Sequence, residues 1–367
     1  MTATTKLFLC GDVMTGRGVD QILPHPGPPH LRERFARSAL EYVALAERAH
    51  GPIPRPAEYT YVWGEALEIL EEERPDARLI NLETCVTTSE DAEPKEINYR
   101  MHPGNVPVLS AAGIDCCTLA NNHSLDWGDE GLLETLDVLE RAGIRTAGAG
   151  WNLATAEMPA IVGMGNGRRV LVFAFGAHDS GVPDAWRARS DKPGVNVLAD
   201  FSRTTVAQVS DAVNAVARED DIVVASIHWG SNWGYEIAGA HRRFAHDLID
   251  SARVDVVWGH SSHHPKAIEI HAGRPIVYGC GDFLNDYEGI PGYREFRGDL
   301  TLMYFVAVDA ASRRLVELAM RPLQIRNFRL RRAAPDDARW LRQMIDRECA
   351  QFGHRTRQRG DGFALEC

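Results

Sequence analysis

Residues 115–123 read Asp-Cys-Cys-Thr-Leu-Ala-Asn-Asn-His, a short and mainly apolar run that ends in three polar residues. A run of this length without regular polar alternation is typical of a strand buried on both faces of a sheet. The following residues carry leucines at three- and four-residue intervals up to Gly143, which predicts an amphipathic helix that ends at that glycine. A buried strand, a polar turn and a helix in succession indicate an α/β fold.

The same pattern extends over most of the chain. Further buried strands are predicted at residues 6–10, 78–82, 169–175, 222–227, 254–258 and 275–279. Helical spacing also relates four valines between two of these strands: Val206, Val209, Val213 and Val216. Up to about residue 280, the alternation predicts a parallel or mixed sheet covered by helices.

Two segments depart from this alternation. Four prolines within residues 23–29 predict a loop, which leads into a helix over residues 31–49. After residue 300 the sequence predicts antiparallel strands at 300–308, 315–320 and 325–330, followed by a helix near 335–349.

Length, charge and hydropathy limit the number of domains and the kinds of partner that this chain can have. The 367 residues correspond to two domains or to one large α/β domain with additions. The net charge of −11 argues against nucleic acid as a partner, because DNA- and RNA-binding proteins neutralise phosphates with a basic face. No run approaches the roughly 18 apolar residues of a membrane span, so a membrane is not an expected partner either.

Cysteine usage and the N-terminus point to a reducing compartment. The seven cysteines are an odd number without zinc-finger spacing, and Cys116 and Cys117 are adjacent, so reduced thiols are expected. The first residues lead directly into a strand and lack an export signal. The predicted localisation is therefore cytoplasmic.

Polar side chains follow the ends of several predicted strands. They are Asp12, Glu83, Asn122 with His123, His228, and His260 with His263 and His264. Ligands of open α/β sheets bind at the carboxyl ends of the strands, so these side chains are expected to converge. Carboxylate, amide and imidazole together form a ligand set suited to Zn, Mn, Fe or Co rather than to Ca²⁺. Singly, each residue has a structural explanation as a cap or a hydrogen-bonded core group; together they favour a metal site.

The order of these motifs resembles the calcineurin-like metallophosphoesterase superfamily, and most closely its CapA-like branch of poly-γ-glutamate capsule synthesis proteins. The matching segments are Gly-Asp-Val-Met-Thr-Gly-Arg (11–17), Asn-Leu-Glu-Thr (81–84), Ala-Asn-Asn-His-Ser-Leu-Asp-Trp-Gly (120–128), Ile-His-Trp-Gly (227–230) and Gly-His-Ser-Ser-His-His-Pro (259–265). The resemblance implies a four-layer α/β/β/α sandwich. Residues 1–308 would form the catalytic domain, with a loop and helix insertion at 21–75, and residues 309–367 would add strands and a helix to the same domain.

The resemblance also implies roles for individual residues. Asp12 would bind a first metal ion, and Glu83 would stand in the place of the acid that bridges two ions. The second ion would take Asn122, His228 and His260, while either His263 or His264 would complete the first site. His123 would be the catalytic residue, which protonates a leaving group or stabilises charge.

This chain departs from the superfamily pattern at three places. Met14 stands where a histidine ligand is usual, and Glu83 replaces the usual bridging aspartate. The usual closing Gly-His-x-His is stretched to Gly-His-Ser-Ser-His-His over residues 259–264. The number of ions, one or two, therefore stays open, and the expected cofactor is a divalent transition metal such as Mn, Zn or Fe. The sequence leaves the oligomeric state open as well.

Four further residues are candidates for substrate binding. Arg17 and Arg100 are suited to an anionic group, whether phosphate or carboxylate. Trp229 and His178 follow strands near the predicted site and either line a cleft or belong to the core. Asp282, after a further strand, is a candidate to orient a ligand histidine.

Two classes of function follow from this. The first is a metal-dependent hydrolase in which metal-activated water attacks a phosphoester or a γ-glutamyl-type amide of a small or polymeric anionic substrate. The second is a non-catalytic accessory protein of poly-γ-glutamate or capsule synthesis that binds a polyanion or a synthase partner.

Overall fold

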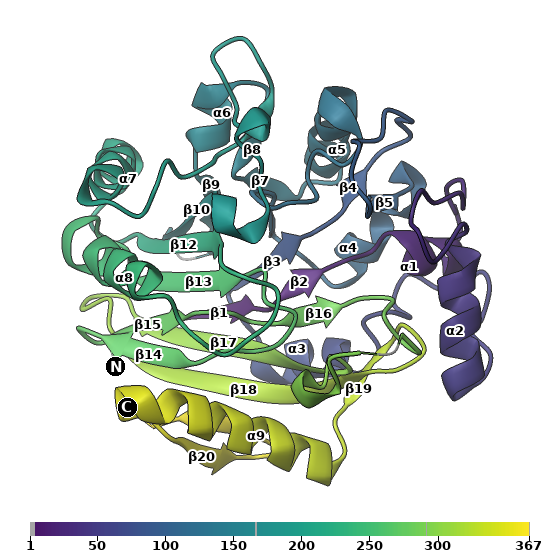
Figure 1. The fold of residues 1–367 in the computed structure, drawn as a ribbon. Coiled ribbons are helices and arrows are strands. Elements are labelled where there is room, and N and C mark those ends of the chain that lie inside the picture. Colours follow the sequence, from purple (N-terminus) through teal and green to yellow (C-terminus); the bar gives the residue numbers. More distant parts are fainter. Residues whose placement is uncertain (1–3, 166, 291, 367) are drawn as a thin grey trace.

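Two β-sheets form the centre of the fold in this computed structural model, which describes residues 4–165, 167–290 and 292–366. The larger sheet runs in the order β16-β2-β3-β1-β17-β18-β21-β20, with β6 and β7 continuing from β3 and with β19 paired to β18. The smaller sheet has the order β14-β15-β13-β12-β10-β9. Figure 1 shows the two sheets facing each other, with helices outside them.

The bounds of the strands are as follows. The larger sheet contains β1 (Thr4–Leu9), β2 (Asp12–Val13), β3 (Ala77–Leu82), β6 (Cys116–Thr118), β7 (Arg145–Ala147), β16 (Asp282–Leu284), β17 (Leu300–Asp309), β18 (Leu315–Ile325), β19 (Leu330–Arg332), β20 (Thr356–Arg359) and β21 (Gly362–Leu365). The smaller sheet contains β9 (Ala160–Gly163), β10 (Arg169–Gly176), β12 (Ile222–His228), β13 (Val256–His260), β14 (Ile268–His271) and β15 (Arg274–Val277). Two short pairs complete the set: β4 (Cys85–Val86) with β5 (Arg100–Met101), and β8 (Ala149–Gly150) with β11 (Gly194–Val195).

Nine helices in the described residues cover these sheets: α1 (Arg17–Ile22), α2 (Leu40–His50), α3 (Ala66–Glu73), α4 (Pro107–Ala111), α5 (Gly128–Arg141), α6 (Leu153–Glu157), α7 (Arg203–Val216), α8 (Gly239–Ser251) and α9 (Pro335–Cys349). None of them has the length and apolar character needed to cross a membrane.

Three apolar cores separate the layers, because successive side chains of a strand point to opposite faces of its sheet. Leu7 and Leu9 of β1 pack between the sheets with Val172 of β10 and Trp258 of β13. Phe8, on the opposite face of β1, packs in a second core with residues of α2, α3, α4 and α5. The outer face of the smaller sheet packs against α7 and α8 in a third core. The predicted four-layer α/β/β/α sandwich is confirmed.

Strand register brings the polar strand ends together. In the larger sheet, Asp12 of β2 lies between Asn81 of β3 and Asp282 of β16. In the smaller sheet, His228 of β12 lies directly beside His260 of β13. Because these neighbours run parallel, their polar ends reach the same edge of each sheet.

The segment before α2 differs from its prediction. A helix is expected from residue 31, but α2 begins only at Leu40. Residues 30–38 instead fold back on themselves, with the amide of Leu31 bonded to the carbonyl of Arg37. This fold turns Glu33 inward to the buried guanidinium of Arg17, 2.9 Å away, and the pairing overrides the local helical pattern.

The C-terminal residues extend the larger sheet. β18 pairs with β17, and β21 and β20 follow at the edge of that sheet, while α9 lies beneath β18 in Figure 1. Six cysteines are buried and unpaired as expected: Cys10, Cys85, Cys116, Cys117, Cys280 and Cys349. The thiol of Cys367 and the N-terminal residues 1–3 lie outside the described residues.

A buried carboxylate joins α3 to this C-terminal edge. Glu73 lies 2.8 Å from Arg321 of β18, 2.6 Å from Arg359 of β20 and 3.3 Å from Lys6 of β1. Burial opposes its charge, but hydrogen bonds from Arg359 and Arg321 outweigh burial and lower the pKa of Glu73 to about 2. Glu73 therefore favours the folded state most where it is ionised.

We expect Glu73→Gln to lower the free energy of unfolding at pH 7 by about 3–5 kcal/mol, the usual cost of breaking a buried ion pair. Because the folded pKa lies below the unfolded value, the stabilisation is complete above about pH 4.5 and is lost as the pH falls towards 2. Urea unfolding of both proteins across this range should show the difference shrinking with acid. Asp336→Asn, in an exposed pair with Arg339, is the control and should cost less than about 1 kcal/mol.

Candidate metal centre and cavity

Asp12, His228 and His260 form a buried group at the facing edges of the two sheets. One potential ligand atom from each lies within 4.8 Å of the others. Each residue is at most 1% exposed. These are the only three residues of the described chain that meet this criterion for a metal-binding group.

Gly11 lets β2 approach β16 closely enough to place Asp12. A Cβ atom at residue 11 would lie 1.7 Å from the carbonyl oxygen of Gly281, so only glycine fits. The amide of Asp12 donates to that carbonyl at 2.9 Å. Its carboxylate accepts from the Asn81 side chain at 2.7 Å and from the Ser261 amide at 3.2 Å, which fixes both oxygens.

Three acidic side chains are crowded here: Asp12, Glu83 and Asp282. Burial and the charge of Asp282 raise the pKa of Asp12 to about 7. Burial and the charge of Asp12 raise the pKa of Glu83 above its ordinary value. Buried carboxylates that repel one another are stabilised by a cation between them.

The two histidines have the protonation state that a metal requires. Burial lowers the pKa of His228, with a further contribution from His260, and burial alone lowers the pKa of His260 to about 3. Both rings are therefore neutral near pH 7, and a neutral imidazole nitrogen is a metal ligand. The Nδ1 atoms of both are buried without a hydrogen-bond partner. The donor set thus fits a divalent transition metal.

His123 lies beside this group, and its ring is positioned by Asp126 and Tyr99. Its Nδ1 atom is 2.6 Å from the buried carboxylate of Asp126, and its ring stacks on Tyr99 at 4.0 Å. Its Nε2 atom lies 3.9 Å from Glu83. Burial lowers the pKa of His123 to about 4. The charge of Asp126 opposes this shift, and the charge of Lys95 adds a smaller lowering effect.

Asn122 connects His123 to the histidine pair. Its side-chain oxygen is 3.0 Å from Nε2 of His228, and its backbone carbonyl accepts from Lys95 at 2.5 Å. The Asn122 oxygen can therefore join His228 as a ligand.

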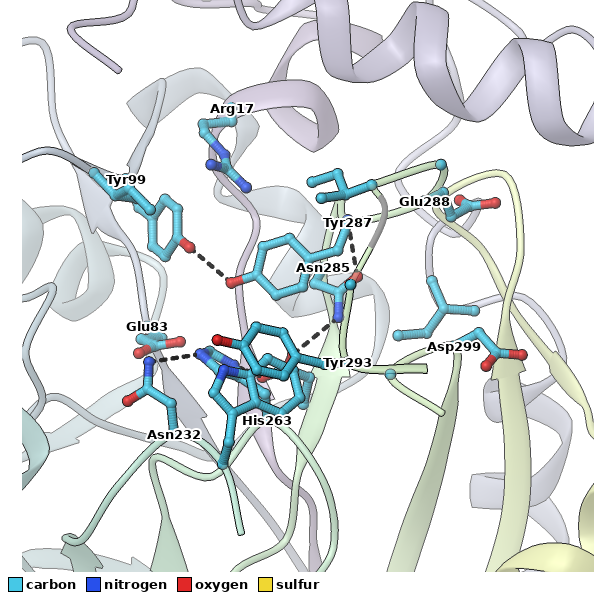
Figure 2. A pocket seen from close by; sticks show the side chains of 18 of the residues that line it. Arg17, Glu83, Tyr99, Asn232, His263, Asn285, Tyr287, Glu288, Tyr293 and Asp299 are labelled. Carbon is cyan, nitrogen blue, oxygen red and sulfur yellow. Dashed lines mark hydrogen bonds and ion pairs between the residues drawn. The ribbon is translucent and has the colours of Figure 1, made fainter. Parts of the chain in front are cut away.

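Glu83, Asn122, His123 and His263, which lie around this buried group, line a cavity of about 920 Å³. Figure 2 shows Glu83 and His263 at one end, Glu288 and Asp299 at the other, and Tyr287 between them. The cavity therefore extends well beyond Glu83 and His263.

The part of the chain that contains these residues is similar to a known protein family. Residues 6–287 match the family model described as bacterial capsule synthesis protein PGA_cap. The chain belongs to this capsule synthesis family. The resemblance stated from the motifs is confirmed, and the match covers all the strand-end residues described above.

Relatives in the family bear related names. A Mycobacterium tuberculosis protein named probable polyglutamine synthesis accessory protein is 51% identical over 97% of this chain and 94% of its own. The PGA biosynthesis protein CapA of Bacillus subtilis is 26% identical over 83% of this chain and 68% of its own. Among solved structures, a phosphatase from Mycoplasma pneumoniae is 12% identical, with a TM-score of 0.46, covering 88% of this chain and 95% of its own.

Of the two adjacent candidates in this family member, His263 faces the site and His264 does not. His263 lines the cavity, with Nδ1 2.9 Å from Asp282 and Nε2 3.1 Å from the Asn232 side chain. The contact with Asp282 is the one expected of a carboxylate that orients a histidine. His264 lies in an aromatic cluster, where its ring stacks on Phe296 at 4.3 Å, so His263 is the better placed of the two predicted alternatives.

The arginines predicted to bind substrate are already engaged. Arg17 lines the cavity, but its guanidinium forms ion pairs with Asp286 and Glu33. Arg100 is outside the cavity, where it donates to the carbonyl of Ser89 and lies 3.9 Å above the Trp127 ring. The charge of Arg17 is neutralised and Arg100 is remote, so neither is placed to pair with an anion in the cavity.

The other two predicted cleft residues also lie elsewhere. Trp229 is 3% exposed and stacks between His241 and Tyr278 in the core outside the smaller sheet. His178 does not line the cavity; it lies near Asp184 at 3.8 Å, with its side chain 45% exposed. Of the two predicted alternatives for Trp229, lining a cleft or packing in the core, the structure shows packing in the core.

Lys95 and Asp126 are the residues that the motifs did not assign. Asp126 follows His123 by three residues, a spacing that could have indicated the pairing. Lys95 lies in an irregular stretch between β4 and β5 and reaches Asp126 at 2.5 Å. Nothing in its local sequence predicts that contact.

Proposed function

We propose that this member of the capsule synthesis family is a metal-dependent hydrolase. The observation that carries the proposal is the buried cluster of Asp12, His228 and His260, whose donors suit a divalent transition metal. Its neighbours Asn122 and Ser261 line a large cavity. Glu83, Asn122 and His263 would extend the ligand set. One ion or two fit this proposal, since Met14 stands where a further histidine ligand is usual.

When bound, a divalent ion supplies Lewis-acid chemistry, which polarises the scissile bond and makes water a stronger acid. The protein holds the surrounding charges in place. Asn81 and the Ser261 amide orient the Asp12 carboxylate, and Asp282 orients His263. The substrate would thus contact polar side chains whose orientations are fixed by hydrogen bonds.

His123 would move a proton at Nε2. Its Nδ1 atom is directed to Asp126, so the free nitrogen of the ring is the one on the side of Glu83. The Tyr99 stack keeps the ring from rotating. This arrangement suits general acid–base catalysis, in which a positioned imidazole exchanges a proton with the reacting group.

The bond cleaved would be a phosphoester or a γ-glutamyl-type amide of an anionic substrate, small or polymeric. The names of the relatives favour the amide, since they refer to polyglutamine and PGA synthesis. A screen of both substrate types, with Mn²⁺, Zn²⁺ or Fe²⁺ added to metal-free protein, should show hydrolysis in one type. Absence of metal-stimulated turnover in both would refute the hydrolase.

A second candidate is a non-catalytic accessory protein that binds a polyanion or a synthase partner. The observation favouring it is the name of the M. tuberculosis relative, which calls that protein an accessory protein. Copurification of a synthesis enzyme together with no turnover would favour this candidate.

A further inference from the structure

The cavity continues past the metal-binding end along an aromatic and aliphatic wall. Trp233 stacks on Tyr293 with ring centroids 4.1 Å apart, and the ring centroid of Trp233 lies 5.2 Å from that of His263. Tyr293 shares the cavity wall with Ile290 and Phe35. This distal wall, defined as Phe35, Trp233, Ile290 and Tyr293, is thus continuous with the proposed catalytic end.

The distal wall is unusually exposed. Phe35 is 60%, Tyr293 55% and Ile290 37% exposed, although each is a large apolar residue. They lie in two separate segments of the chain that converge on one cavity. Exposed apolar groups gathered at the mouth of a cavity mark a binding site for a ligand with apolar surface.

The cations of the same cavity are paired with carboxylates. Arg17 pairs with Asp286, Lys95 with Asp126, and Arg297 with Asp299. His50 contacts Glu288 at 2.7 Å. In the described part of the chain, Arg294 is the lining arginine or lysine that lacks such a partner. A polyanionic chain would therefore find no row of free positive charge here.

We propose that the distal wall binds an aromatic or other flat apolar group attached to the scissile phosphoester or amide. The substrate is then a small molecule with its reacting group at the metal end and its apolar part against Tyr293 and Trp233, rather than an extended polyanion. This inference rests on the proposed function.

Two pairs of probes that differ only in the organic group test the assignment. They are phenylphosphonate with methylphosphonate, and γ-glutamyl anilide with γ-glutamyl methylamide. Binding to metal-loaded protein, with hydrolysis scored separately, is measured by calorimetry. The aryl member of at least one pair should bind about tenfold more tightly than its partner, as expected for one buried aromatic contact.

Variants localise the effect. Tyr293→Ala and Trp233→Ala should reduce the aryl preference, the ratio of aryl to methyl affinity in the same variant, to about threefold or less. Trp151→Ala is the matched control, because Trp151 is 51% exposed but does not line the cavity, and it should keep the full preference.

Equal binding of aryl and methyl members in both pairs would overturn the proposal, as would tighter binding of a γ-glutamate hexamer than of either aryl probe. Retention of the full preference in both wall variants would overturn it too. Failure of the hydrolase and failure of the distal wall give different results. The phosphonates contain no scissile phosphoester and report binding alone, so turnover is taken from the screen of phosphoester and γ-glutamyl substrates. An aryl preference in binding without turnover in that screen removes the hydrolase and keeps the distal wall, whereas turnover in the screen with equal binding of methyl and aryl members keeps the hydrolase and removes the distal wall.

Discussion

His123→Ala should lower turnover on the best substrate of the screen by about 10²–10⁴-fold, the usual contribution of a positioned general acid or base. Bound metal should stay nearly unchanged, because the ring is directed by Asp126 and Tyr99 and is not part of the cluster of Asp12, His228 and His260. Steady-state kinetics and metal analysis of the same preparation measure both effects.

Asp126→Asn serves as a companion variant. It removes the charge behind Nδ1 of His123 without removing the ring, so turnover should fall less than in His123→Ala. Full activity in His123→Ala would contradict the assigned role. Loss of metal from that variant would instead place His123 among the ligands.

Asp12→Ala and His228→Ala should each lose metal, with affinity reduced by more than about 100-fold, since each removes a proposed ligand. Asp12→Ala also leaves Asn81 and the Ser261 amide without their acceptor. Metal titration into chelator-treated protein, followed by calorimetry, measures the affinity.

His264→Ala is the matched control for the loss of metal. His264 is adjacent in sequence to His263, but its ring packs on Phe296 and Tyr235 away from the cavity. Metal affinity should therefore stay within about threefold of the native protein. Loss of metal in His264→Ala, with retention in His228→Ala, would reverse the ligand assignment.

The helix-covered sheet and the meeting of polar strand ends could be predicted from the sequence pattern, whereas the four-layer sandwich followed from the resemblance to the family. A buried strand followed by a polar residue is visible in the sequence, and parallel register then brings His228 beside His260 and Asp12 beside Asn81. The local pattern marks where each strand ends, and the parallel topology brings those ends together, so the sequence predicts which side chains meet.

The surroundings of the site were less predictable because they depend on contacts between distant segments. Arg17 follows the first motif, but its ion pair with Asp286 joins residues 269 positions apart. Trp229 follows His228, a proposed ligand, yet its side chain points to the opposite face of the sheet, into the core. The distal wall likewise combines Phe35 with Tyr293, which no local pattern relates.

Anomalous diffraction from crystals grown with Mn²⁺ or Zn²⁺ tests most directly whether Asp12, His228 and His260 hold a metal ion. A peak about 2.0–2.3 Å from at least one donor atom of each residue is the expected result. Absence of any peak among these three residues, in crystals where the ion is found elsewhere on the protein, would contradict the account.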